Sequence, residues 1–268
     1  MRNLACSGAK ALAVTDNLNF GNPNKPEAYF MLKECVKGLA DACAFFDVPV
    51  VGGNVSLYNE HGEGAIDPTP VVSMVGLIDE QEHVTKSQIS ETGMELFLLG
   101  GLPSELGASY FLQTQHGKKE GSVPEVNLEN EKKLQQLLIA QIESGKIKAA
   151  HDLSEGGLLV CLAEMLFDGK ELGASVSISP ENSIDRLDAL LFGESQGRVI
   201  VAVSSSEAGE FISSAQSAGV TVDSLGQTND SGQLTVRVSG QEVLSSSVKE
   251  LRSKWENAIP DHMESSKR

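Results

Sequence analysis

Two short apolar strands, each followed at once by polar residues, most constrain how this chain folds. The first covers residues 11–14 and runs into Asp16, and the second covers residues 48–51 and runs into the Gly-Gly-Asn of residues 52–54. Wholly apolar strands are typical of sheets that are buried on both faces. Apolar residues recur at helical spacing between them, over residues 29–46. We therefore expect the polar strand ends to meet at one edge of a buried sheet.

The residue types at these strand ends suit a bound nucleotide. Asp16 and Asn54 carry hard oxygen ligands, which Mg²⁺ prefers when phosphate oxygens hold it as well. Gly52 and Gly53 lack a β-carbon, so their amides can approach a phosphate closely. A structural interpretation stays open: Asp16 would cap a turn, and the glycine pair would let the chain reverse.

A second polar motif, His-Asp-Leu-Ser-Glu-Gly-Gly, spans residues 151–157, after an expected strand at 147–150 and before an expected helix. A helix N-terminus beside glycines attracts anions, whereas Asp152 favours a metal. The alternative is that Ser154 is the N-cap of that helix and that Glu155 complements the helix dipole.

A third polar motif, Gly-Glu-Ser-Gln-Gly-Arg, spans residues 193–198 between an apolar helix and an apolar strand. Its Glu194 and Gln196 side chains can form hydrogen bonds with a ligand. A solvated loop is the alternative interpretation of this run.

The polar stretch 79–92 is the expected boundary between two domains, residues 1–82 and residues 83–268. Helices and strands alternate in the second domain. The first residues look like the end of a helix, a stop at Gly8 and then a strand, which predicts that the chain is a piece of a longer protein.

Local turn and cap signals complete the predicted secondary structure. Asn24 is the expected N-cap of the first long helix. Residues 229–232 predict a hairpin turn between strands at 220–225 and 234–238, and a last helix is expected over 241–257.

Composition argues against two classes of partner. The 268 residues carry 37 acidic and 21 Lys and Arg side chains, a formal net charge of −16, which disfavours a nucleic-acid partner. No apolar run approaches the ~20 residues that a membrane span needs, so we expect no membrane partner.

The four cysteines form no C-x-x-C pair, which favours a reducing cytoplasm over a disulfide framework.

Four runs occur in an order that resembles one known family. They are residues 15–23 (Thr-Asp-Asn-Leu-Asn-Phe-Gly-Asn-Pro), residues 51–60 (Val-Gly-Gly-Asn-Val-Ser-Leu-Tyr-Asn-Glu) and the motifs at 151–157 and 193–198. Together they resemble the C-terminal half of phosphoribosylformylglycinamidine synthase of the small, multi-subunit bacterial type. The resemblance covers nearly the whole chain. The first two runs are specific to that enzyme, and the other two are shared with its superfamily, which includes aminoimidazole ribonucleotide synthetase and selenophosphate synthetase.

The resemblance implies a mixed α+β and α/β fold of the aminoimidazole-ribonucleotide-synthetase type. Residues 1–82 would be part of a β-rich, ATP-binding N-terminal domain, and residues 83–268 a complete α/β C-terminal domain. The family enzyme is an ATP-dependent carbon–nitrogen ligase of purine biosynthesis with glutamine as amido donor. With ATP and Mg²⁺ it converts formylglycinamide ribonucleotide into formylglycinamidine ribonucleotide, through an iminophosphate that ammonia displaces.

Roles follow from the resemblance position by position. Asp16 and Gly53 match ATP-binding positions, Asn54 matches a magnesium ligand, and Ser56 matches a substrate contact. A second set of residues faces a pseudo-symmetric site that holds a structural nucleotide in some members, so we expect an auxiliary or structural role for them: His151, Asp152, Glu194, Ser195 and Gln196.

The family's catalytic histidine and ATP-contacting lysine belong to the first half, which this sequence does not contain. We therefore expect the chain to be inactive alone, with no catalytic residue of its own. It would need the N-terminal half, a separate glutaminase subunit and a small bridging subunit as partners. Two alternatives stay open: a non-catalytic, nucleotide-binding scaffold half, and another ATP-dependent member such as aminoimidazole ribonucleotide synthetase. If the chain folds alone, the strands at 11–14 and 48–51 should present exposed, adhesive edges.

Overall fold

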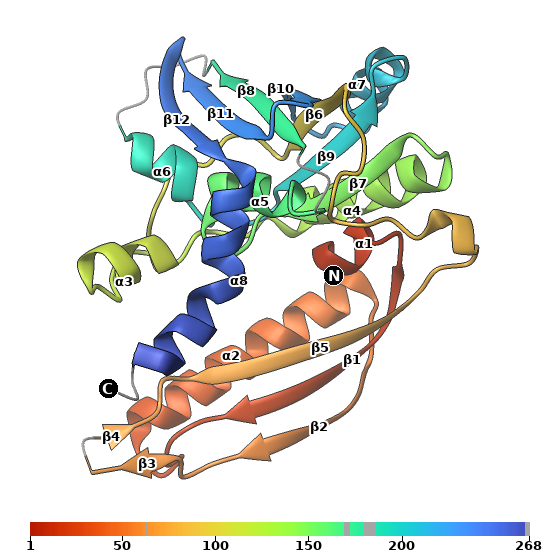
Figure 1. Ribbon diagram of the computed structural model, residues 1–268. Coiled ribbons are helices and arrows are strands. Elements are labelled where there is room, and N and C mark those ends of the chain that lie inside the picture. The colour runs from red at the N-terminus through yellow and green to blue at the C-terminus, as the bar shows by residue number, and fades with distance from the viewer. Residues whose placement is uncertain (63, 169–171, 180–185, 266–268) are drawn as a thin grey trace. The chain divides into compact units, whose positions relative to one another are not determined.

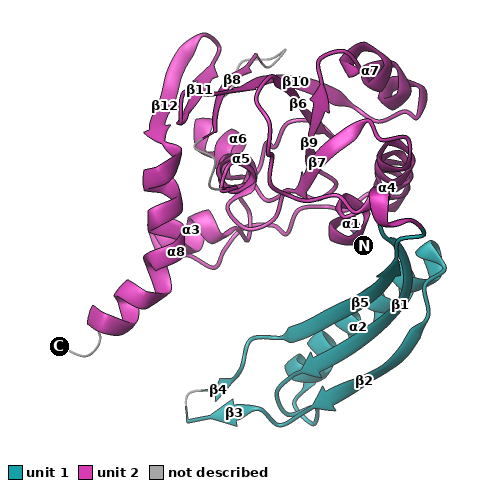
Figure 2. Cartoon of the chain, turned by 45° about the vertical axis from the view of Figure 1, so that its right-hand side comes forward, with its two compact units in different colours: residues 1, 9–79 teal, residues 2–8, 80–268 magenta. Residues whose placement is uncertain are grey.

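The chain divides into two units of unequal size (Figure 2). Unit 1 comprises Met1 and residues 9–79, and unit 2 comprises residues 2–8 and 80–268. The expected boundary after residue 82 therefore differs from the observed division mainly at the start of the chain, where a short helix belongs to unit 2. The computed structural model describes the following residues: 1–62, 64–168, 172–179 and 186–265.

Strands β6 (Met94–Leu99) and β9 (Val199–Ser204) are interior strands of the sheet of unit 2, and both carry buried side chains on their two faces. Alternate residues of a strand point to opposite faces of its sheet. Leu96 and Leu98 accordingly join one hydrophobic cluster, while Phe97 and Leu99 join a second cluster on the other face. Both faces of this sheet must therefore be covered.

Helices cover both faces of the sheet of unit 2 (Figure 1). One cluster includes side chains of α5 (Gly157–Met165), α6 (Leu187–Phe192) and α8 (Val248–Ser265). The other includes side chains of α1 (Arg2–Cys6), α4 (Leu128–Glu143) and α7 (Ala208–Ser217). The result is a layered α/β unit with a mostly antiparallel sheet.

The strand order of unit 2 corrects the expected hairpin. Within the described residues the seven strands run β12-β11-β8-β10-β6-β9-β7, and only β8 and β11 pair in parallel. Strand β8 therefore lies between the two strands that residues 229–232 connect. The closing hairpin instead joins β11 to β12, across Ser239 and Gly240, which both have positive φ.

The remaining elements of unit 2 have the following bounds: β7 (Ile147–Asp152), β8 (Gly173–Ile178), β10 (Val222–Asn229), β11 (Gln233–Val238), β12 (Gln241–Ser247), α3 (Tyr110–His116) and the 3₁₀ helix Gln81–His83.

The last expected helix is also displaced by this hairpin. Residues 241–257 were expected to be helical, but Gln241–Ser247 form β12, and α8 runs from Val248 to Ser265. Strand β12 pairs with β11 from Gln241 to Ser247. The backbone hydrogen bonds of this pairing outweigh the local helical preference of residues 241–247.

Polar contacts attach α1 to the rest of unit 2. The Arg2 guanidinium forms two hydrogen bonds with the buried carboxylate of Glu131, at 2.6 and 3.2 Å. The amide of Asn3 donates to Asp152 at 3.2 Å. Gly8 has a φ of +88°, and a β-carbon there would overlap the carbonyl oxygen of His83. These contacts explain why residues 2–8 group with unit 2.

Unit 1 contains a three-stranded sheet with the order β2-β1-β5. Strand β1 (Lys10–Asn19) is central, so the expectation that residues 11–14 form an exposed edge is wrong. Strand β2 (Val50–Ser56) is an edge, as expected, but Val50 and Val51 are 49% and 65% exposed rather than buried. A small β3–β4 pair, Glu60–His61 and Gly64–Ala65, and β5 (Thr69–Leu77) complete the unit.

Helix α2 (Pro26–Phe46) lies along one face of this sheet (Figures 1 and 2). It begins at Pro26, and the cap residue Lys25 makes no side-chain capping bond, so Asn24 is not the N-cap. Proline suits this first position because its missing N–H would be unpaired there anyway. No residue of α2 is buried, and Cys35 and Cys43 on its inner side are only half-buried.

We predict that Arg2→Ala destabilises unit 2 by about 3 kcal/mol, because it leaves the buried Glu131 carboxylate without its charged partner. The free energy of unfolding is measured by denaturant titration with the fluorescence of Trp255, the single tryptophan, which lies in unit 2. Arg237→Ala is the control, since it removes an exposed ion pair with Glu242. Equal effects of the two substitutions would contradict the anchoring role of Arg2.

Candidate functional site

Asp16 and Gly53 are directly paired across two parallel strands of unit 1. The register joins Asp16 to Gly53 and Asn17 to Asn54. A β-carbon at Gly53 would overlap the Asp16 carboxylate and would lie 2.7 Å from its carbonyl oxygen. Gly52 has open space at the same position. Gly53, and not Gly52, is therefore the glycine that the Asp16 side chain requires.

The same register separates Asp16 from Asn54. Successive residues of a strand point to opposite faces, so the Asp16–Gly53 pair and the Asn17–Asn54 pair lie on opposite sides of the sheet. Asn54 Nδ2 donates to Asn17 Oδ1 at 3.1 Å on the second side. The expectation of a shared site at two strand ends is thus corrected: these residues lie inside β1 and β2, and residues 52–54 neither end a strand nor reverse the chain.

Ser56 lies on the same face of β2 as Asn54 and belongs to a local hydrogen-bond network. Its hydroxyl donates to Asn59 Oδ1 at 3.2 Å. The Asn59 amide also donates to the carbonyl oxygens of Phe20 and Ser56. This network holds the turn after β2 against the end of β1, and it fixes the orientation of the Ser56 side chain.

The donor set of unit 1 suits a magnesium ion only when other ligands complete its coordination. Asn54 uses its nitrogen on Asn17, so its carbonyl oxygen Oδ1 remains available as a hard ligand. Among the described residues, no three His, Cys, Asp or Glu side chains come together as a metal site. A magnesium ion at Asn54 would therefore take most of its ligands from phosphate and water.

His151, near the end of β7, interacts with acidic groups of unit 2. Its Nε2 lies 3.3 Å from Glu164 Oε2, and its Nδ1 lies 2.9 Å from the carbonyl oxygen of Asp152. Burial lowers the pKa of the imidazole, but the Glu164 and Asp152 interactions together outweigh burial and raise it above the ordinary value. Glu164 also accepts a hydrogen bond from Trp255 Nε1 at 3.0 Å. Glu164 thus joins β7 to α8 through α5.

Asp152 is buried, and both of its carboxylate oxygens accept hydrogen bonds from neighbours within unit 2. One carboxylate oxygen accepts from Asn3, and the other accepts from the Ser154 hydroxyl at 3.1 Å. Burial, and after it the Asp152 charge, raise the pKa of the nearby Cys6 thiol far above its ordinary range. Cys6 is therefore a protonated core residue and not a nucleophile.

Glu194 connects the N-termini of two helices. Its Oε1 accepts from the backbone N–H of Gly156 at 2.8 Å, before α5, and from that of Tyr110 at 3.1 Å, at the start of α3. The expectation that Ser154 caps α5 is wrong, because the cap residue is Gly156 and Ser154 bonds to Asp152 instead. A carboxylate at a helix N-terminus compensates the unpaired amides and the helix dipole.

Close glycine contacts hold the motifs at 151–157 and 193–198 against each other. Gly157 has a φ of +66°, and a β-carbon there would lie 2.7 Å from the carbonyl oxygen of Gly193. The glycines of the first motif therefore serve close backbone packing here. Ser195 is buried, and its hydroxyl has no hydrogen-bond partner among the described residues.

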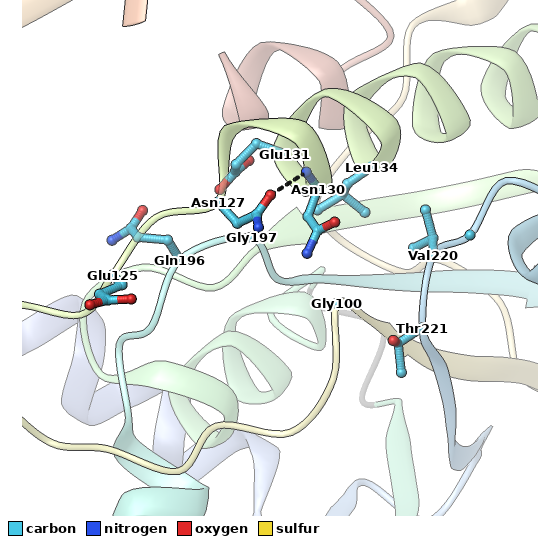
Figure 3. A pocket seen from close by; sticks show the side chains of 11 residues that line it. Gly100, Glu125, Asn127, Asn130, Glu131, Leu134, Gln196, Gly197, Val220 and Thr221 are labelled. Carbon is cyan, nitrogen blue, oxygen red and sulfur yellow. Dashed lines mark hydrogen bonds between the residues drawn. The ribbon is translucent and has the colours of Figure 1, made fainter. Parts of the chain in front are cut away.

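Gln196 lines a polar cavity of about 140 Å³ at the N-terminus of α4 (Figure 3). Its Oε1 accepts from Arg2 at 2.8 Å, so α1 supports this wall of the cavity. The residues that line it, all in the described part of the chain, include two carboxylates and no basic side chain, which does not suit a phosphate. They are Gly100, Glu125, Asn127, Asn130, Glu131, Leu134, Gln196, Gly197, Gly219, Val220 and Thr221.

Sequence reasoning missed three residues that organise these motifs. In unit 2, Arg2 forms a hydrogen bond with Gln196, and Glu131 forms hydrogen bonds with Arg2. Glu164 pairs with His151. Arg2 and Glu131 lie 129 positions apart, so no local pattern links them. The apolar helical periodicity around Glu131, which predicts that its side is buried, is the one signal that could have identified it.

Comparison with known proteins shows the class to which the chain belongs. Residues 1–78 match the N-terminal domain of AIR synthase related proteins, and residues 91–239 match their C-terminal domain. The second match alone covers more than half of the chain. The chain belongs to the AIR synthase related family, and the expected fold class is confirmed.

Two curated relatives are subunits of the enzyme that the sequence motifs resemble. The chain is similar to phosphoribosylformylglycinamidine synthase subunit PurL of Deinococcus radiodurans, with 43% identity over 96% of this chain and 35% of the relative. It is 39% identical to the subunit of the same name from Alkaliphilus metalliredigens, over 99% of this chain and 35% of the relative. The chain thus spans about a third of the length of these relatives.

Solved structures share the fold. T. maritima PurL complexed with FGAR superposes with a TM-score of 0.74 and 22% identity, over 93% of this chain and 41% of that one. T. maritima PurL complexed with ATP gives a TM-score of 0.72 at 22% identity, over 92% and 39%. E. coli HypE, a hydrogenase maturation protein, gives 0.65 at 19% identity, over 91% and 74%. At these identities the likeness concerns the fold alone.

None of the helices in the described part of the chain is both long enough and apolar enough to cross a bilayer.

We predict that Glu164→Gln lowers the pKa of His151 and removes a pH-dependent part of the stability of unit 2. The raised pKa means that charged His151 stabilises the fold below its ordinary value of 6.5, and that this contribution is lost as the pH rises through the raised value. The wild-type chain should therefore exceed the variant in unfolding free energy at pH 6, and the difference should shrink with rising pH.

NMR titration of the His151 ring and denaturant titrations at several pH values measure these two effects. Glutamine retains an acceptor for the hydrogen bond from Trp255, so the variant changes mainly the charge at position 164. An unchanged His151 titration in Glu164→Gln would refute the assignment.

Proposed function

We propose that this chain is the C-terminal part of an ATP-dependent phosphoribosylformylglycinamidine synthase. The observation that carries the proposal is the agreement of the two-unit AIR synthase fold with relatives of that name at 39–43% identity, of which the chain spans a third. The substrate would be formylglycinamide ribonucleotide and the product formylglycinamidine ribonucleotide. The four free thiols agree with a reducing compartment, and we propose the cytoplasm.

The proposed reaction exchanges an amide oxygen for nitrogen. An amide oxygen is a poor leaving group, so it attacks the terminal phosphorus of ATP, which releases ADP and leaves an iminophosphate. Ammonia from glutamine then adds to the carbon, and phosphate departs with the oxygen, which gives the amidine. Positioning and charge compensation provide most of the catalysis in phosphoryl transfer. A bound magnesium ion would neutralise the transferring phosphate.

The described residues support distinct roles on the two faces of the small sheet. The close pair of Asp16 and Gly53 offers a backbone surface without a β-carbon and an adjacent carboxylate, and we assign it to ATP. On the opposite face, we assign Asn54 Oδ1 to magnesium and the Ser56 hydroxyl to the ribonucleotide substrate. Helix α2 lies along one of these faces (Figures 1 and 2), so the two assignments require that the strands adjust when the ligands bind.

Exposed apolar surface supports the need for further polypeptide around unit 1. Contiguous exposed apolar surface on a folded unit marks a contact with further polypeptide. Helix α2 exposes Tyr29, Phe30, Met31 and Val36, and the edge strands expose Val50, Val51, Val55, Val71, Val72, Val75 and Leu77. The proposed cover is the N-terminal part of the synthase, which would also bring the catalytic histidine. A glutaminase subunit and a small bridging subunit would supply ammonia.

His151, Asp152, Glu194, Ser195 and Gln196 keep a structural assignment in this proposal. Four of these five residues make hydrogen bonds or ion pairs inside unit 2, and the neighbouring cavity lacks basic groups. We therefore assign them to the positioning of α1, α3 and α5 rather than to a nucleotide.

We predict that the 268-residue chain alone shows no ATP- and ammonia-dependent turnover, and that co-expression with the N-terminal part restores it. In the restored enzyme, Asn54→Ala should lower turnover by about 100-fold and raise the magnesium requirement, because it removes a metal ligand. Steady-state assays with ammonium salts and a magnesium titration measure both effects. Turnover by the isolated chain, or full activity of Asn54→Ala, would overturn this part of the proposal.

We predict that Gly53→Ala abolishes ATP binding by the restored enzyme while Gly52→Ala retains it. An added β-carbon at Gly53 displaces the Asp16 carboxylate and presses on its backbone, whereas open space surrounds Gly52. Isothermal titration with a non-hydrolysable ATP analogue measures the affinity, and far-ultraviolet circular dichroism checks the fold. Similar affinities in the two variants would remove the evidence for an ATP site at Asp16 and Gly53.

A further inference from the structure

His151 presents both of its ring nitrogens to hydrogen-bond acceptors. Its Nδ1 lies 2.9 Å from the backbone carbonyl oxygen of Asp152, and its Nε2 lies 3.3 Å from Glu164 Oε2. A neutral imidazole has one N–H group and one lone pair, whereas the imidazolium has two N–H groups. Either neutral tautomer therefore places a lone pair against an acceptor oxygen. Only the protonated ring satisfies both contacts.

The titratable side chains that α1, α4 and α5 contribute near β7 do not compete for this proton. The thiols of Cys6 and Cys161 stay protonated, because burial raises the pKa of each. Arg2 and Glu131 pair with each other at 2.6 Å. The neighbouring strand β9 places the uncharged Ile200 opposite His151. The charges that act on the imidazole are those of Glu164 and Asp152.

Glu164 connects His151 to α8. Its Oε2 faces the imidazole, and its Oε1 accepts from Trp255 Nε1 at 3.0 Å. The indole therefore holds the carboxylate in front of His151 Nε2 while α8 lies on α5. The Glu164 side chain is 27% exposed, so without the indole it can rotate into water. The charged side chains of α8 around Trp255 pair within the helix: Arg252 with Glu256 and Lys254 with Glu250.

Trp255 is a main point of attachment for α8. At the start of the helix Val248 is buried and Leu251 is partly buried, and the second half extends away from the sheet of unit 2 (Figures 1 and 2). An apolar cavity of about 270 Å³ lies beside α5 and α8. Trp255 is 59% exposed and contacts the Phe167 ring at a centroid distance of 5.9 Å. With so little buried surface, the hydrogen bond to Glu164 weighs heavily in the docking of α8.

We propose that His151, Glu164 and Trp255 form a proton-dependent latch, in which the protonated imidazole keeps α8 docked on α5 and loss of the proton releases it. Docking of α8 fixes the Glu164 charge at His151 Nε2, so docking and protonation favour each other. Such coupling is reciprocal, and each event strengthens the other by the same factor.

The direction of the pH dependence follows from the neighbours of His151. Burial lowers the pKa of the imidazole, but the Glu164 and Asp152 interactions outweigh burial and raise it above the ordinary value of 6.5. The stabilisation of the docked helix is therefore complete below pH 6.5. It is lost as the pH rises through the raised value.

A pH titration of the 268-residue chain tests the latch. NMR of the histidine rings and of the Trp255 indole N–H should give one shared midpoint for His151 and Trp255, above pH 6.5. Trp255 emission should shift to longer wavelength over the same range, because water reaches the released indole. His262→Gln removes the other histidine of α8 and should leave this midpoint unchanged. A Trp255 transition that disappears in His262→Gln would contradict the proposal.

Two further variants test the reciprocal coupling. Trp255→Phe keeps an aromatic ring beside Phe167 but lacks the N–H group, so the His151 midpoint should shift to lower pH. Glu164→Gln can accept from Trp255 and donate to a neutral Nε2, so the shift of Trp255 emission above pH 6.5 should be lost. Circular dichroism checks that both variants fold. An unchanged His151 midpoint in Trp255→Phe, or an unchanged emission shift in Glu164→Gln, would overturn the latch.

Discussion

The burial of β6 and β9 on both faces is the constraint on which unit 2 depends. Leu98 and Val199 to Val203 have essentially no exposed surface, so each face of the sheet needs its own layer of helices. That need places α1 and α4 on one side and α5 and α8 on the other. The polar motifs lie in the connections between these layers. Their geometry follows from the packing of the apolar core.

The polar residues of unit 2 show how a motif with the appearance of a binding site can serve structure. Glu194 accepts amides from two helices, Asp152 accepts from α1 and from Ser154, and Gln196 accepts from Arg2. Buried polar groups require such partners, because an unsatisfied group costs about 1–3 kcal/mol. The motifs therefore connect α1, α3 and α5 through charge-assisted hydrogen bonds.

In the described part of unit 1 only one face of the sheet has a helical layer, whereas both faces are covered in unit 2. The sheet of unit 1 has α2 on one side, and valines of both edge strands remain exposed. The side-chain alternation of β1 and β2 then distributes Asp16 and Asn54 to opposite faces. A site that uses both residues therefore cannot form on a single face of this sheet. This geometry agrees with a chain that spans a third of its relatives.

Local patterns in the sequence located the strand at 11–14, the apolar strand that follows residues 193–198 and the start of β7, and the resemblance of the motifs implied the mixed fold class. Local patterns could not determine strand order, because β8 enters between β10 and β11 through pairing with distant segments. They could not identify Arg2 and Glu131 as partners, since residues 129 positions apart meet only after the core has formed. Nor could they separate Asp16 from Asn54, because the face of a side chain depends on where its strand begins and ends. Residue types and local periodicity are properties of the chain itself, whereas register, strand order and partners are decided when buried surface is shared between remote elements.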